Sequence, residues 1–143
     1  MWDNIAIWFK LRDWAELFAE RGYNFVAATY TNAWAETIHH LNERHPFESM
    51  AKAYCLVILN NNLNHRLKLM EKIIKEYKVD GLVIHSDRSC KPYSIGQYGL
   101  KRLLTERLGI KSVLIESDMT DFRVYSEDQA RKNLEAFFEA LEN

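Results

Sequence analysis

The chain has 143 residues, of which 48% are apolar and 13% aromatic, with only five Gly and two Pro. This composition excludes a disordered or low-complexity protein, and the length is that of one domain with its own hydrophobic core. The 19 basic and 20 acidic side chains give a net charge of -1, which excludes the strong positive field that nucleic acid or an anionic membrane surface selects.

The cysteines and the apolar runs indicate where the protein works. Cys55 and Cys90 are too few for a disulfide framework. The longest apolar run, Ala53–Leu59, is far shorter than the roughly 20 residues that span a bilayer. The N-terminus also lacks the basic start and apolar stretch of a signal peptide. We therefore expect a cytoplasmic protein without a membrane segment.

The first half of the chain contains two clear predicted elements and one weak region. Apolar residues at helical spacing predict a helix from Ile7 to Arg21, ended by Gly22. Phe25–Tyr30 is short, apolar and rich in strand-forming residues, so it predicts a buried strand. Between Ala33 and His45 the pattern fits either a short helix or an ordered loop. A helix over 46–59, with Pro46 in its first turn, follows.

The second half alternates helices with strands. A stripe of apolar side chains predicts a helix over 63–77, and the run Val79–His85 predicts a second buried strand. Ser112–Glu116 predicts a third strand. Each of these strands is short and apolar, which is typical of strands buried on both faces.

Two sequence patterns of the capping-box type mark the beginnings of the last two helices. In such a pattern a Ser hydroxyl accepts the amide N–H three residues later, while the Gln side chain at that position reaches back. Ser94 with Gln97 predicts the start of a helix that ends at Gly109. Ser126 with Gln129 predicts the start of the final helix.

This alternation predicts one α/β domain over residues 1–143. We expect an open, mainly parallel sheet of three to four strands with helices on both faces, of a flavodoxin-like or Rossmann-like but truncated type. Residues 1–3 fit the stub of a fourth strand whose beginning lies upstream.

In such a sheet, ligands bind beyond the carboxyl ends of the strands. Polar side chains follow each predicted strand, over residues 30–32, 86–92 and 117–121, and they include Asn32 and Asp118. We expect the three loops to converge on one edge. The sequence contains no dinucleotide-binding glycine motif, P-loop or Cys-x-x-Cys pair that would assign this edge to a known chemistry.

Cys90 is the residue at this edge whose surroundings most clearly indicate a chemical role. It lies between Arg88 and Lys91 and ahead of a predicted helix, and cations and helix N-termini favour the reactive thiolate. An inert loop cysteine is the alternative. Cys55, in an apolar stretch, is expected in the core. His85, at the end of a strand, is either a site residue or a core histidine.

Residues 80–94 (DGLVIHSDRSCKPYS) resemble the C-terminal domain of the 2-hydroxyacyl-CoA dehydratase component D family, which also includes benzoyl-CoA reductase subunits. The likeness continues through residues 2–5 (WDNI), 26–32 (VAATYTN), 96–98 (GQY), 116–121 (ESDMTD) and Arg123. It thus covers essentially the whole chain, and the Arg-Ser-Cys-Lys element is its most specific part.

The resemblance implies that Cys90 is one of three cysteine ligands of a [4Fe-4S] cluster, the other two coming from a preceding domain of the same subunit. The nearest candidates to surround that cysteine are Arg88, Ser89, Lys91 and Ser94, and the strand ends add His85, Asn32 and Asp118 at the edge of the site. Family members are much longer than this chain, and Cys55 matches no ligand position. We therefore interpret the chain as a C-terminal domain that is inactive and holds no cluster by itself.

The resemblance further implies an enzyme that eliminates water from a 2-hydroxyacyl-CoA by radical chemistry, giving an enoyl-CoA. Two related subunits form a heterodimer, and an ATP-dependent iron-sulfur activator supplies one electron. It identifies no catalytic acid or base in this chain. Two alternatives stay open, namely a benzoyl-CoA reductase-type subunit that reduces a ring, and a non-catalytic α/β binding or assembly module that has lost the cluster.

Overall fold

The sheet is built around β2 (Gly81–Asp87), which pairs with a strand on each side. The computed structural model describes all 143 residues and places β1 (Trp2–Asp3) on one side of β2 and β3 (Lys111–Ser117) on the other. Both pairings are parallel. The predicted open parallel α/β sheet is therefore confirmed, with three strands, of which the N-terminal residues form one.

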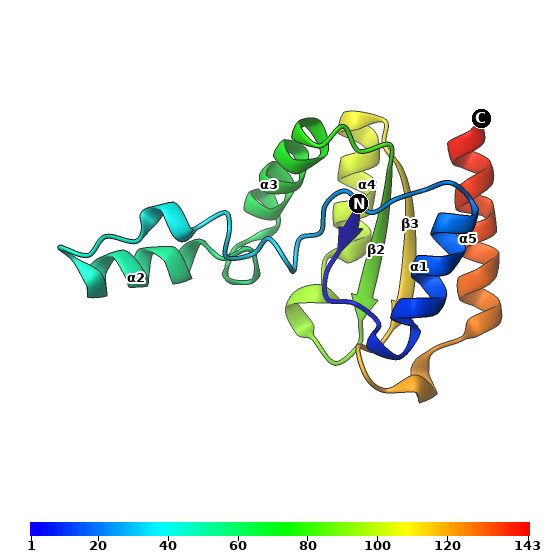
Figure 1. Cartoon of the computed structure of the whole chain (residues 1–143), viewed down its shortest axis with the longest axis horizontal. Helices are drawn as coiled ribbons and strands as arrows, with labels where there is room; N and C mark the ends of the chain where they lie inside the picture. Colours follow the sequence, from blue (N-terminus) through cyan, green and yellow to red (C-terminus); the bar gives the residue numbers. More distant parts are fainter.

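Four helices cover the two faces of this sheet. α1 (Leu11–Glu20) and α5 (Glu127–Glu142) lie on one face, and α3 (Leu63–Glu76) and α4 (Gln97–Leu108) lie on the other (Figure 1). The predicted placement of helices on both faces is thus confirmed. No helix is long and apolar enough to cross a bilayer.

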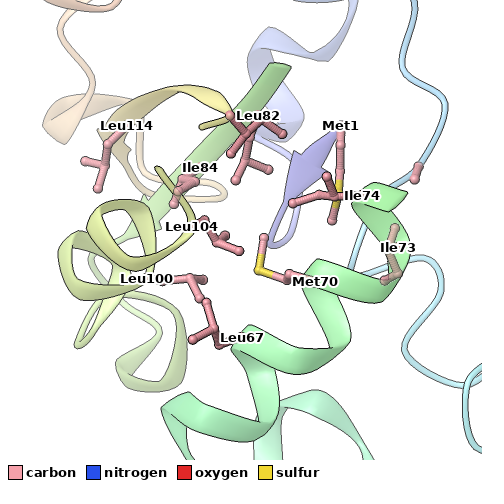
Figure 2. Close-up of a cluster of buried hydrophobic side chains, with 12 residues drawn as sticks. Met1, Leu67, Met70, Ile73, Ile74, Leu82, Ile84, Leu100, Leu104 and Leu114 are labelled. Atoms are coloured by element: carbon pink, nitrogen blue, oxygen red, sulfur yellow. The ribbon is translucent and has the colours of Figure 1, made fainter. Parts of the chain in front are cut away.

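Each face of the sheet buries its own apolar cluster, because successive side chains of a strand point to opposite sides. Leu82 and Ile84 face α3 and α4, while Val83 faces α1 and α5. Figure 2 shows the first cluster, in which the helical side chains are Leu67, Met70, Ile73, Ile74, Leu100 and Leu104. The second cluster includes four aromatic side chains, Trp14, Phe18, Phe137 and Phe138.

The strand predicted over 25–30 is wrong. The segment makes only one bridge, between Trp2 and Ala28, with hydrogen bonds from Trp2 N to Ala27 O (3.0 Å) and from Thr29 N to Trp2 O (3.1 Å). The reason is that β1 is two residues long and offers no further pairing. Val26 is consequently 51% exposed instead of buried.

α2 (Pro46–Leu56) projects away from the sheet (Figure 1). It ends earlier than predicted and is followed by the 3-10 turn Ile58–Asn60, while the undecided region before it contains turns and the 3-10 turn Ile38–His40. Cys55 is exposed, so its predicted place in the core is wrong. Apolar spacing identified a helix here, but no second layer covers it, and Phe47 is 87% exposed.

The two predicted capping boxes have different outcomes. Ser126 accepts a hydrogen bond from Gln129 N, as predicted for the start of α5, but the Gln129 side chain donates to Asn133 Oδ1 (2.8 Å) instead of reaching back. At α4 the cap is Gly96, which has a φ of 97°, and the prediction for Ser94 is wrong. The Gln97 side chain is fully buried and binds Asp3 and the His85 carbonyl instead of the helix end. The buried Gln97 amide binds a carboxylate and a strand carbonyl, both of which need a donor, in place of the helix end.

Two glycines at the start of α4 should respond oppositely to alanine. We expect Gly96→Ala to destabilise the fold by about 1–2 kcal/mol, because a residue with a Cβ is disfavoured in the left-handed conformation. Gly99→Ala should stabilise it by roughly 0.5–1 kcal/mol, because a new Cβ would lie at an ordinary 3.6 Å from Leu63 and alanine favours the helix. Urea unfolding of both variants measures these changes, and equal signs would contradict the assigned conformations.

Candidate functional site

The loops that follow β1, β2 and β3 meet at the carboxyl edge of the sheet, at the bottom of the view in Figure 1. Arg88 N donates to Ser117 O (2.9 Å), which joins the loop after β2 to the end of β3. Trp8 N donates to Met119 O (3.1 Å), which joins the loop after β1 to the loop after β3. Backbone hydrogen bonds thus join the loops after β1, β2 and β3, whereas residues 30–32, which were also expected at this edge, make only local backbone hydrogen bonds.

Cys90 lies half-buried in a tight turn directly after β2. Its N–H donates to Asp87 O (3.1 Å), and its carbonyl accepts from Tyr93 N (3.0 Å). The 3-10 turn Lys91–Tyr93 separates it from α4, which begins at Gln97. The backbone of Cys90 is thus held by hydrogen bonds on both sides.

The neighbours of Cys90 are mostly engaged elsewhere. Arg88 is exposed and pairs with Glu116 at 3.4 Å. Ser94 donates to Lys91 O at 3.5 Å. Lys91 is exposed and makes no ion pair. Lys91 is therefore the one cation beside Cys90 that is free to meet a ligand.

Ser89 lies between two carboxylates. Its hydroxyl oxygen lies 3.1 Å from Asp87 Oδ1, and its single proton is donated either to this carboxylate or to that of Asp118. Hydrogen bonding from the Ser89 side chain, and then from the N–H groups of Thr120 and Asp121, holds the pKa of Asp118 well below the usual carboxyl range. Asp118 Oδ1 lies 3.0 Å from each of these two backbone nitrogens. Asp118 therefore stays ionised and fixes the turn after β3.

His85 and Asn32, the other predicted site residues, make no hydrogen bond to the turn at residues 88–94. His85 is fully buried, and its Nδ1 lies 2.8 Å from Ile5 O, while its Nε2 has no partner. Burial lowers its pKa, which favours the neutral ring. Asn32 is half-buried in a turn, where its N–H donates to Ala28 O at 3.3 Å. His85 thus has the environment of a core histidine.

A group of buried polar residues under the edge was missed from the sequence. Arg66 of α3 is 5% exposed, and Asp3 and Gln97 are fully buried. Gln97 Nε2 donates to Asp3 Oδ2 (2.9 Å), and Thr29 Oγ1 donates to Asp3 Oδ1 (2.8 Å). One signal was present, because Arg66 occupies a position on the apolar stripe of its helix, three residues after Leu63.

The edge contains one thiol and no complete metal site. No three His, Cys, Asp or Glu side chains gather in a way that could hold a metal ion. Both cysteines are free, and Cys55 lies on the projecting α2. Iron-sulfur clusters need several thiolates, so the single thiol at this edge does not fit a whole cluster.

The chain is similar to one family of proteins along nearly its whole length. Residues 1–141 match the family described as 2-hydroxyglutaryl-CoA dehydratase, D-component. The chain is 34% identical to a benzoyl-CoA reductase subunit of Thauera aromatica over 140 residues, which are 94% of this chain and 32% of that protein. It is 28% identical to lactoyl-CoA dehydratase subunit alpha of Anaerotignum propionicum, over 99% of this chain and 33% of that protein.

A third relative is (R)-2-hydroxyglutaryl-CoA dehydratase, subunit alpha, of Acidaminococcus fermentans, which is 28% identical over 99% of this chain and 28% of its own length. The chain therefore spans about a third of the length of these relatives. All three are named as subunits.

The ionised Asp118 gives a prediction about pH. Because folding lowers its pKa, its carboxylate stabilises the folded state at neutral pH, and this contribution is lost as the pH falls below the ordinary carboxyl value of about 4. The difference in unfolding free energy between wild type and Asp118→Asn should therefore be largest at neutral pH and shrink in acid.

Chemical unfolding at a series of pH values measures this difference. Glu139→Gln, on the exposed face of α5, is the matched control and should show little change at any pH. A difference for Asp118→Asn that is constant from neutral to acid pH would show that its carboxylate is not specially stabilised.

Proposed function

Because the chain belongs to the 2-hydroxyglutaryl-CoA dehydratase D-component family, we propose that it is the C-terminal domain of a dehydratase-type subunit and contributes Cys90 as one ligand of a [4Fe-4S] cluster. The complete enzyme eliminates water from a 2-hydroxyacyl-CoA. The observation that carries the proposal is the place of Cys90, the only thiol at the carboxyl edge, in a turn fixed by backbone hydrogen bonds.

Within this proposal, the chain's own residues position the thiol and shape its surroundings. The bound cluster supplies one-electron chemistry. The Cys90 thiolate is its ligand from this domain, and the exposed Lys91 is the nearest free cation to compensate anionic charge beside the sulfur. Arg88, already paired with Glu116, is a weaker candidate for that role. Two further cysteines must come from the part of the subunit that this chain does not contain.

The proposed assembly has a second, related subunit and an ATP-dependent iron-sulfur activator as partners. The naming of all three relatives as subunits supports a multi-subunit enzyme. The acyl-CoA class of substrate is supported by the CoA thioesters that appear in the same names. A cytoplasmic location completes the proposal.

Ring reduction is the second candidate function. The identity to the benzoyl-CoA reductase subunit is 34%, against 28% for the two dehydratase subunits. Assaying the complete, activated enzyme with an aromatic CoA thioester and with 2-hydroxyacyl-CoA thioesters separates the two. Reduction of the aromatic ring without release of water from the hydroxy substrates would select the reductase.

Replacement of Cys90 in the complete subunit tests its assigned role. We expect Cys90→Ser to lower iron content and turnover together while the fold survives, because a hydroxyl is a poorer iron ligand than a thiolate. Cys55→Ser is the matched control. Because Cys55 is exposed, this change should alter the unfolding free energy by less than about 0.5 kcal/mol and leave the iron content unchanged.

Iron and sulfide analysis together with thermal unfolding of both variants gives the answer. If Cys90→Ser kept the full cluster and full turnover, the ligand assignment would be wrong. A non-catalytic binding or assembly module would then become the better account of this domain.

The chain by itself should not retain a stable cluster. After anaerobic reconstitution, the monomer separated by size should contain far less iron than the four atoms of a [4Fe-4S] cluster, because one thiolate cannot hold it. About four irons and four sulfides per monomer would overturn the need for ligands from outside this chain.

A further inference from the structure

We propose that Arg66 of α3 is the positioning residue for the loop that carries Cys90. This inference rests on the proposed role of Cys90 as the functional thiol of the domain. Arg66 is buried beneath the loop, and its Nη1 donates to Pro92 O at 2.8 Å. Its Nη2 donates to Gln97 Oε1, also at 2.8 Å.

These contacts fix the part of the loop that follows Cys90 in the chain. Pro92 lies two residues after Cys90, and Gln97 is the first residue of α4. Between them, the Tyr93 ring lies under the guanidinium group, whose carbon is 5.2 Å from the ring centre. One side chain therefore contacts the 3-10 turn at two residues and the beginning of the following helix at a third.

Gln97 connects this clamp to the sheet. Its Nε2 donates to His85 O (3.0 Å) in β2 and to Asp3 Oδ2 (2.9 Å) in β1. Its Oε1 accepts from Arg66. A continuous set of hydrogen bonds thus runs from the strands through Gln97 and Arg66 to Pro92, so the turn is set at a defined place relative to the sheet edge.

The energetics point to positioning instead of general stability. The nearest carboxylate, that of Asp3, is 3.7 Å from Arg66 Nη2, and Arg66 Nε has no partner at all. Removing a cation from water is costly, and an apolar side chain at this point of the stripe would pack between Leu63 and Met70 without that cost. What only arginine supplies is a planar fork that donates to two acceptors at once.

Hydrogen exchange of the isolated chain tests this role. Amides in the loop, including those of Cys90, Tyr93 and Ile95, are protected by hydrogen bonds to Asp87 and Lys91 as well as within the turn. We expect Arg66→Met to speed exchange over residues 88–97 by about fivefold, the factor for losing one net hydrogen bond, while exchange in α5 is unchanged.

Two further variants make the result specific. Ile73→Val, in the same helix but away from the loop, is the control and should change all slow amides together without a local effect on 88–97. Arg66→Lys retains the charge but not the fork, so it should speed loop exchange less than Arg66→Met does. If Arg66→Met does not fold, the test compares exchange over residues 88–97 in Arg66→Lys with that in Ile73→Val. Faster exchange confined to this loop in Arg66→Lys alone supports the positioning role.

A second readout follows the thiol itself. Alkylation of Cys90, measured relative to the exposed Cys55 in the same molecule, should be faster in Arg66→Lys than in the wild type, because a loosened turn exposes the sulfur. Unchanged loop exchange, or acceleration of α5 by the same factor as the loop, would overturn the positioning role. Because neither measurement involves iron, such a failure leaves the ligand assignment of Cys90 to its own test.

Discussion

The buried carboxylate of Asp3 is the interaction on which the carboxyl edge of this fold depends. It lies in the short first strand and is completely withdrawn from water, so each of its oxygens must be satisfied inside the protein. Thr29 and Gln97 donate to its two oxygens, and the Arg66 guanidinium lies 3.7 Å away. One side chain therefore joins β1, the segment beside it, α3 and the start of α4. Because β1 contributes only two residues to the sheet, these side-chain bonds add to the short strand pairing in fixing the position of the N-terminal segment.

The same network explains why the loop after β2 can carry a defined function. Loops tolerate mobility unless their backbone is held, and this one is held from two directions. The backbone of Arg88 is bonded to the end of β3, and Pro92 is bonded to the buried arginine beneath it. Cys90 lies between these two points. If Cys90 is a cluster ligand, as proposed, its thiol gains from such a fixed position, since a loose ligand would lose entropy on binding iron.

The sequence predicted the sheet, its helical layers and the place of Cys90, because apolar strands alternating with amphipathic helices leave few arrangements. It failed where the outcome depends on a neighbour that periodicity does not reveal. Residues 25–30 have strand composition but only a two-residue partner, and Cys55 has an apolar context but no layer above it. Gln97 was assigned to a cap because local patterns do not show that a buried carboxylate lies nearby. Arg66 was detectable, as a cation on an otherwise apolar stripe, but its partners are set by tertiary structure.

We have proposed that Cys90 presents its sulfur to iron in a complete subunit. A crystal structure of that subunit, purified without oxygen and with anomalous scattering recorded at the iron absorption edge, tests it most directly. If Cys90 is a ligand, an iron peak will lie at bonding distance from Cys90 Sγ, and the other thiolates bound to the iron will belong to residues outside this chain. A cluster whose ligands all lie elsewhere, with Cys90 free and no metal beside it, would contradict the account.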